Sequence, residues 1–407
     1  MFKWMLPAAA VAALAMGCAL TGNSASAEDD ARGKKSRARE LSERNSEFGV
    51  DLFKRLHVKG ENTFISPTSI AMCLQMVAQA SKGDTNAEFR KTMHLGEIDL
   101  DLANADLLER LKDRDGAKLR VANALWSDPA RVTLNQEYVD EMAKYFEAEV
   151  RASDFDAPAT LDEVNGWISD KTEKKIPRML ERIEKDDVTF LINAIYFKGA
   201  WSYQFDKEDT KEADFHLADG STTKVQMMRR SDEIPYAELP GLQLVKLPYG
   251  GDKKIAMWVA LPAADSSLEK LIAGMDKGSL KRWQDAAHAR EGTLKLPRIK
   301  MKFKKNLNDD LKALGIKLAF DSGSADLSRL GSSVMGRLYL GFVLHEAVVE
   351  VNEEGTEAAA ATIAGIKAES IGPEPFSMVC DRPFLFWISD ENTGATLFMG
   401  AVYKPGE

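Results

Sequence analysis

Residues 353–362 of the chain read EEGTEAAAAT and open a connection of 28 residues, from Gly355 to Arg382, with little sign of a packed element. A connection that long inside a compact domain is unusual and is often functional. Written as a strand, its first half has one face that is small or apolar throughout and another that carries both charges. The first face comprises Thr356, Ala358, Ala360, Thr362, Ala364 and Ile366, and the second comprises Glu357, Ala359, Ala361, Ile363, Gly365 and Lys367.

This stretch is nevertheless not expected to be a strand from the outset, because alanine is a poor strand former. No proline stands between Gly355 and Ile371, so every residue there could donate to a β-ladder. The pattern therefore favours a loop that can become a strand. On composition alone, a short alanine-rich helix or a passive linker fits at least as well.

The rest of the chain alternates between helical and strand-like patterns, which indicates one large mixed α/β domain over residues 41–407. Residues 188–197 form an almost continuous apolar run of strand length, typical of a central strand buried on both faces. One helix is expected from Leu41 onward, and another after Ser66, where Pro67 stands in the first turn. Further strands are expected over residues 244–247, 256–261, 294–303, 338–351, 384–388 and 396–402.

The formal net charge of −9 argues against a nucleic-acid partner, because phosphate binding needs a basic field. No stretch of 18 or more apolar residues occurs outside the extreme N-terminus, so the body is not expected to span a membrane. Neither a CxxC motif nor a Cys/His cluster suggests zinc, and no metal or cofactor is expected. Cys73 fits a small buried thiol better than a disulfide partner of Cys380.

The N-terminus has the pattern of an export signal over residues 1–27, with Lys3 ahead of an apolar run and small residues at 25–27. A second interpretation competes equally: Cys18 follows a stretch similar to a bacterial lipobox and would carry a lipid. Residues 28–40 are charged and are expected to form a flexible tether. The protein is therefore expected to be secreted, periplasmic or lipid-anchored, and the lipid would be its one link to a membrane.

From residue 41 to residue 405 the chain resembles the serpin family. Any one matching block is weak, but all of them occur in order and at sensible spacing. The blocks are residues 64–70 (FISPTSI), 119–126 (LRVANALW), 193–201 (NAIYFKGAW), 225–228 (VQMM), 247–249 (LPY), 314–316 (LGI), 325–328 (ADLS), His345, 353–362, 382–384 (RPF) and 398–400 (FMG). The resemblance implies three β-sheets, eight or nine helices, and an exposed reactive loop over about residues 353–382.

The resemblance also implies a mechanism, which is strand addition by the chain's own loop. A target endopeptidase, of the serine or else the cysteine class, would cut the loop as a substrate and be trapped as an acyl-enzyme when the loop inserts. The chain would not be an enzyme, and a monomer is expected. Counting seventeen residues from the hinge glutamate, Glu353, places the reactive bond between Glu369 and Ser370, although cuts after residues 366, 367 or 368 stay open.

The family pattern assigns further roles near the sheet. Ser66, Ser69, Asn193 and His345 match a polar cluster where the sheet opens, with Asn193 expected to bond to His345. Trp201 is expected to cap the place where the loop first enters, and Glu353 to hold the strand end by a polar contact. A Ser/His hydrolase is disfavoured because there is no GxSxG elbow.

A non-inhibitory carrier, chaperone or storage serpin is the main alternative function. Such members usually carry bulky, charged or proline residues in the hinge. Here the hinge residues Gly355, Thr356, the four alanines at 358–361 and Thr362 are all small, which favours inhibition. The lysines at 300, 302, 304 and 305 are interpreted as one solvated strand face rather than as a heparin-type site.

Overall fold

The computed structural model describes residues 36–112, 117–356 and 374–406. In these ranges the chain forms nine α-helices and three β-sheets, which confirms the expected mixed α/β fold. The helices are α2 (Arg37–Leu56), α3 (Pro67–Ala80), α4 (Gly83–Thr92), α5 (Leu100–Leu111), α6 (Gln136–Tyr145), α7 (Pro158–Lys171), α8 (Leu268–Ala273), α9 (Ser279–Asp285) and α10 (Asn308–Leu314).

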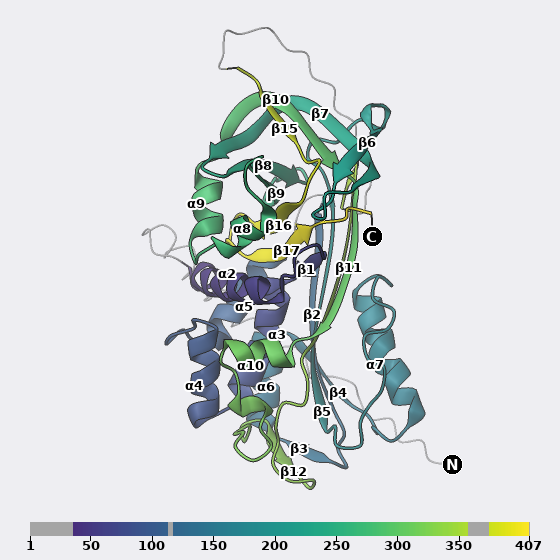
Figure 1. The fold of residues 1–407 in the computed structure, drawn as a ribbon. Coiled ribbons are helices and arrows are strands. Elements are labelled where there is room, and N and C mark those ends of the chain that lie inside the picture. Colours follow the sequence, from purple (N-terminus) through teal and green to yellow (C-terminus); the bar gives the residue numbers. More distant parts are fainter. Residues whose placement is uncertain (1–35, 113–116, 357–373, 407) are drawn as a thin grey trace, which may run out of the picture.

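A nine-stranded sheet occupies the upper part of the molecule in Figure 1. Its strands run in the order β1 (Thr63–Ile65), β17 (Thr396–Val402), β16 (Phe384–Asp390), β9 (Ile255–Pro262), β8 (Leu242–Tyr249), β7 (Thr222–Leu239), β10 (His288–Pro297) and β15 (Phe376–Val379), with β6 (Lys211–His216) paired to β7.

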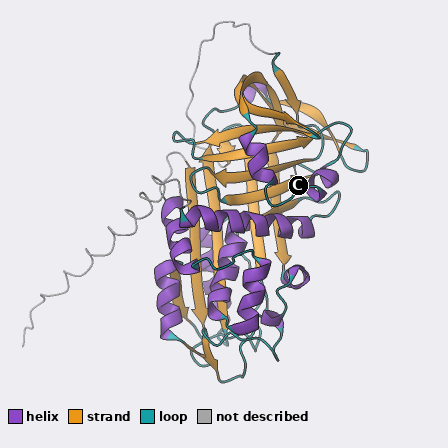
Figure 2. Ribbon diagram, turned by 90° about the vertical axis from the view of Figure 1, so that its left-hand side faces the viewer, coloured by secondary structure: helices purple, strands orange, loops and turns teal. Residues whose placement is uncertain are grey.

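A six-stranded sheet runs down the length of the molecule, with α7 on one face and the helices α2 to α6 grouped on the other (Figures 1 and 2). Its order is β11 (Ile299–Asn306), β13 (Leu344–Asn352), β14 (Gly355–Thr356), β5 (Thr189–Ala200), β2 (Ala117–Ser127) and β4 (Ala148–Ala152). The third sheet is the short pair of β12 (Gly331–Ser333) and β3 (Val132–Leu134).

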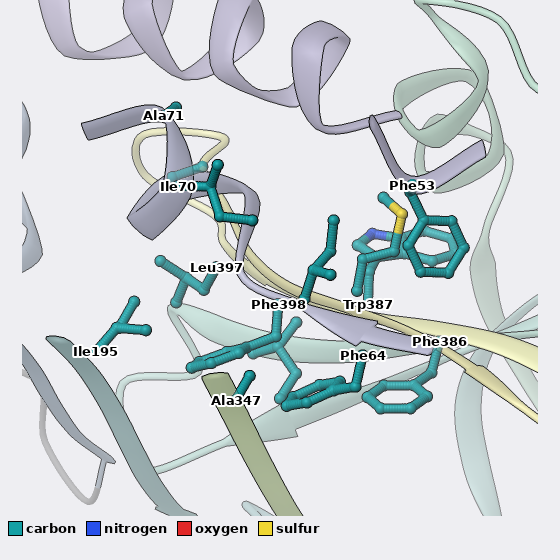
Figure 3. Close-up of a cluster of buried hydrophobic side chains, with 14 of the residues drawn as sticks. Phe53, Phe64, Ile70, Ala71, Ile195, Ala347, Phe386, Trp387, Leu397 and Phe398 are labelled. Carbon is teal, nitrogen blue, oxygen red and sulfur yellow. The ribbon is translucent and has the colours of Figure 1, made fainter. Parts of the chain in front are cut away.

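Helix α3 lies between the two large sheets because its sequence is apolar almost all round. The hydroxyl of Ser66 caps its first turn by accepting the N–H of Ser69 (3.2 Å), and Pro67 follows at the first helical position. Figure 3 shows side chains of α3, β5, β13 and β17 meeting in one core, with Phe398 packed beside Phe64. The polar cluster of the candidate site is built on this junction.

The expected tether over residues 28–40 is wrong at its end, because α2 begins at Arg37. The hydroxyl of Ser36 accepts the N–H of Arg39 (3.3 Å), and the N–H of Ala38 donates to Asp106 (2.9 Å). Ala38 is fully buried. A single apolar residue among charges is too little to reveal a helical period in the sequence.

Three strand predictions need correction. The strand expected over residues 294–303 is two strands, β10 and β11, in different sheets, and Pro297 ends the first because it lacks an N–H donor. The strand expected over 338–351 begins only at Leu344. The loop expected over 353–382 contains two short strands, β14 at its start and β15 near its end, where β15 pairs in parallel with β10.

Candidate functional site

The six-stranded sheet has a gap between β5 and β13. Among the described residues, the edge of β5 that faces away from β2 pairs with β14 alone, through Ala200 with Gly355 and Gly199 with Thr356. The facing edge of β13 likewise pairs with β14 alone, through Asn352 with Gly355 and Val351 with Thr356. Below Thr356, the described parts of the two strands form no ladder with each other, although both continue in the same direction. We call this gap the slot.

The slot is hollow. A small cavity directly below Thr356 has a volume of about 30 Å³ and is lined by Tyr196 of β5 and Val348 of β13, among others. A larger cavity of about 400 Å³ follows, lined on one side by residues 188–193 and on the other by residues 338–345. Helix α3 and residues 179–180, which follow α7, also line it. Of the described residues of the connection, the two residues of β14 reach only the upper end of this space.

The upper end of the slot holds β14 by close backbone packing. Gly355 has a φ of 143°, and a Cβ there would lie 2.1 Å from the carbonyl oxygen of Gly199, so no other residue fits. Thr356 is only 4% exposed, and its hydroxyl lies 2.8 Å from the hydroxyl of Tyr249. The first residues of the 28-residue connection are thus already part of the sheet.

Glu353 is fixed just before β14 by an ion pair between its buried carboxylate and the half-exposed side chain of Arg298. Its carboxylate is 2% exposed and accepts hydrogen bonds from Arg298 Nη2 (2.7 Å), Arg298 Nε (2.9 Å) and the hydroxyl of Thr210 (2.6 Å). Burial would raise the pKa of Glu353, but these donors hold it below its ordinary value. The carboxylate therefore stays charged and anchors the connection where it leaves β13.

Trp201 covers the same place from the end of β5. Its indole N–H donates to the carbonyl oxygen of Asn352 (2.9 Å), and its ring stacks on Tyr249 with centroids 4.3 Å apart. Its backbone N–H donates to the carbonyl oxygen of Glu354 (2.8 Å). The structure therefore places Trp201 over the first residues of the connection.

The predicted polar cluster lies at the middle of the slot, beneath α3. The hydroxyl of Ser69 donates to Asn193 Oδ1, and Asn193 Nδ2 donates to Asn123 Oδ1 (2.7 Å). On the other side of the slot, the backbone N–H of Ser66 donates to His345 Nε2 (3.2 Å). The expected bond between Asn193 and His345 is not among the hydrogen bonds of the described residues, because the slot separates their strands.

His345 is kept neutral by this arrangement. Its Nε2 accepts a hydrogen bond and so carries no proton, and its side chain is buried away from water. Desolvation lowers the pKa of His345 from 6.5 to about 3. Protonation would therefore cost the hydrogen bond to Ser66 and bury a charge.

We expect a pH dependence of stability that His345→Gln removes. Between pH 6.5 and pH 3 the unfolded chain binds a proton at this position that the folded chain does not, so stability falls as pH falls, by about 1.4 kcal/mol per unit. Melting temperatures measured from pH 7.5 to pH 4.5 should therefore drop more steeply for the wild type than for the variant, by about 2–3 °C per pH unit below 6. Parallel curves for the two proteins would contradict this assignment.

Sequence reasoning missed four residues of the site: Asn123, Thr210, Tyr249 and Arg298. Asn123 lies directly opposite Asn193 in the β2–β5 ladder and could have been found as the one amide in an apolar strand pattern. Thr210 and Arg298 come from outside the sheet and carry no local signal. The hinge residues 358–362, the predicted bond Glu369-Ser370 and the predicted lipid site Cys18 lie outside the described residues.

The remaining predictions concern thiols, lysines and membrane. Cys73 is half-buried beside the slot and Cys380 is fully buried, both as free thiols. Of the lysine run, Lys302 lies 2.9 Å from the buried carboxylate of Glu346 and Lys304 lies 2.8 Å from Glu181, so these two are engaged in ion pairs. In the described ranges, no group of three acidic, Cys or His side chains could hold a metal, and no helix is long and apolar enough to cross a membrane.

The six-stranded sheet has an open slot, and β14 at the start of the long connection occupies its upper end. This arrangement defines a class of protein that can take a segment of its own chain into the sheet. The family model described as Serpin (serine protease inhibitor) matches residues 43–405. Serpin B3 of Homo sapiens is 34% identical over 396 residues, which cover 90% of this chain and 99% of that protein. Leukocyte elastase inhibitor of Equus caballus is 33% identical over 387 residues, covering 90% and 100%. The chain belongs to the serpin family.

Solved structures agree with the assignment. The native state of the thermophilic serpin tengpin superposes with a TM-score of 0.82 at 28% identity, covering 89% of this chain and 94% of that chain. Its latent state gives a TM-score of 0.79 at 26% identity, covering 89% and 97%.

Proposed function

We propose that this serpin inhibits its target endopeptidase as a suicide substrate, and that residues 357–369 are the strand that fills the slot after the cut. The observation that carries the proposal is the slot itself, open between β5 and β13 and started by Gly355 and Thr356. A sheet with two unpaired facing edges and a hollow between them gains ladder hydrogen bonds and apolar burial when a strand enters.

The register supports this occupant residue by residue. If β14 simply continues, Thr362 comes to lie between Asn193 on β5 and His345 on β13, so the hydroxyl of the incoming strand meets the polar cluster. Neighbours across a ladder share a face, so every second residue from Thr356 onward would point toward the core with Ile195 and Ala347 (Figure 3). These are the small and apolar positions of the sequence pattern, and the charged Glu357 and Lys367 fall on the opposite face.

The covalent chemistry comes from the target. Its nucleophilic oxygen or sulfur attacks the carbonyl carbon of the residue before the cut, and the C–N bond to the next residue breaks. The proton of the nucleophile ends on the new amine, and the residue before the cut stays attached to the protease as an ester or thioester. Insertion then carries the protease away before water can release it, so this chain supplies no catalytic group.

A protease panel tests the proposal. Incubation with elastase, trypsin, subtilisin, papain and a glutamyl endopeptidase should give, for at least one of them, a complex that survives boiling in detergent. A carrier or storage serpin would only be cut, without a stable complex. An unexpected hydrolase would turn over an ester substrate without any protease. The small side chain at the described hinge position Thr356 favours the inhibitor over the carrier.

We place the reactive bond between Glu369 and Ser370, so the favoured target has a basic specificity pocket, as a glutamyl endopeptidase does. Glu369→Arg should shift inhibition toward trypsin-like enzymes, with a gain in association rate of at least about 100-fold, because a bidentate charge pair in a buried pocket contributes about 3 kcal/mol. Mass-spectrometric mapping of the bond cut by the trapped protease checks the position. An unchanged cut and target spectrum in the variant would exclude Glu369.

We also propose that the chain is exported. The support is the N-terminal pattern over residues 1–27 alone. The mass of the mature N-terminus tests it. A chain that begins at Glu28 would be secreted, a lipid-modified Cys18 would anchor the protein to a membrane, and a chain that keeps residues 1–27 would contradict export.

A further inference from the structure

The lower end of the slot is lined by a segment that the sequence predicts as strand but that is not one in this structure. The strand pattern covers residues 338–351, whereas β13 begins at Leu344. Residues 338–343 instead line the 400 Å³ cavity, opposite residues 188–193. The residues of this segment favour a strand. We therefore attribute the absence of a strand here to the lack of a neighbouring strand in the slot.

The edge of residues 338–343 that faces away from the slot already makes hydrogen bonds like those of a continued β13. The N–H of Val343 donates to Asn308 Oδ1 (2.8 Å), and Asn308 Nδ2 donates to the carbonyl oxygen of Gly341 (2.8 Å). The N–H of Leu307 donates to the carbonyl oxygen of Val343 (2.8 Å). Asn308 is the first residue of α10, which follows the end of β11 (Figure 1). Its side-chain amide therefore takes the place of the next residues of β11.

The other edge faces the slot. Because backbone groups alternate between the two edges of a strand, those of Phe342 point away from Asn308 and toward the cavity. The N–H of Leu340 donates to the carbonyl oxygen of Ala319 (2.7 Å), so one existing bond has to be exchanged before the segment can pair. The segment is therefore aligned on its outer edge, whereas its inner edge forms no ladder with the described residues and has the N–H of Leu340 bonded to Ala319.

We propose that residues 338–343 are a reserve length of β13, aligned by Asn308, that becomes strand when the cut loop enters the slot. This inference rests on the proposed function and deepens it, because it fixes where the inserted strand ends. The present strands can pair the loop on both sides only as far as residue 363, which falls opposite Leu344. With the reserve length, pairing on the β13 side continues to Leu338.

The length of the reserve segment agrees with the proposed reactive bond. Thr356 lies opposite Val351, and thirteen residues further along each chain, in opposite directions, Glu369 comes to lie opposite Leu338. The strand pattern of the sequence thus ends at the residue where the cut loop would end. The end point at residue 369 is obtained here without counting from the hinge glutamate, because it uses only the β13–β14 register and the pattern over residues 338–351.

Hydrogen exchange before and after a single loop cut by subtilisin tests the inference. Residues 189–200 and 344–352 should gain protection on cutting, and the amides of 338–343 should gain at least about tenfold with them. If the first two segments gain and 338–343 do not, the reserve strand is wrong and loop insertion stands. If none of the three gains, the proposed function itself fails.

A pair of variants tests the role of Asn308 as a positioning residue. Asn308→Ala should reduce the protection that residues 338–343 gain on cutting and should raise the amount of inhibitor cut per protease trapped, several-fold. Asn306→Ala is the matched control, because Asn306 Oδ1 accepts the N–H of Asn308 at the start of α10 (2.9 Å) but has no bond to residues 338–343. Equal behaviour of the two variants in both measurements would overturn the role of Asn308.

Discussion

Thr356→Arg should convert the protein from an inhibitor into a substrate. Thr356 occupies a closed position, where its hydroxyl meets Tyr249 and its backbone pairs with both Gly199 and Val351. An arginine there would leave the sheet in the uncut protein, and insertion would then have to bury its unpartnered charge, which costs several kcal/mol. The first step of insertion would then be slower than release of the acyl-enzyme, and a delay worth about 3 kcal/mol corresponds to about 100-fold in rate.

The measurement is the number of inhibitor molecules cut for each protease trapped. We expect a value near one for the wild type and a rise of at least about tenfold for Thr356→Arg, with cleavage of the loop undiminished. Thr356→Val is the matched control, because it keeps the shape of threonine and loses only a hydrogen bond worth about 1 kcal/mol. It should trap protease nearly as well as the wild type, and full trapping by the arginine variant would contradict insertion at this position.

The mixed α/β class could be predicted from local patterns and the three-sheet arrangement from the family resemblance, whereas the hinge after Thr356 stays a prediction. Periodicity and turn residues located eight of the seventeen strands of the described residues, and the small side chains after Gly355 predict the segment that would pass into the sheet. The slot could not be predicted, because an unpaired edge is a property of two strands far apart in the chain. The expected bond between Asn193 and His345 is absent from the described residues for the same reason: the two side chains lie on strands that the slot separates.

The error at residues 338–343 has a different cause. Sequence patterns report what a segment can form, and the structure reports what it forms with the partners present. The predicted strand over 338–351 is paired where β11 and β14 are available, and it stops at Leu344 where an asparagine side chain replaces a neighbouring strand. In a protein that gains a strand during function, such a difference between the predicted and the observed strand marks a segment that can become a strand once a neighbouring strand is present.

Cutting the loop should raise the melting temperature by about 13 °C. Filling the slot adds about ten ladder hydrogen bonds at about 1 kcal/mol each, and the melting temperature of a domain of this size rises by about 1.3 °C per kcal/mol. The uncut protein must then be metastable, because the same bonds are available to it in principle and only the intact connection keeps them unmade. Differential scanning calorimetry of the uncut and subtilisin-cut proteins checks the prediction. Protein cut at an exposed loop away from the slot is the control and should not gain stability. Equal melting temperatures of the uncut and loop-cut forms would contradict insertion of the loop into the slot.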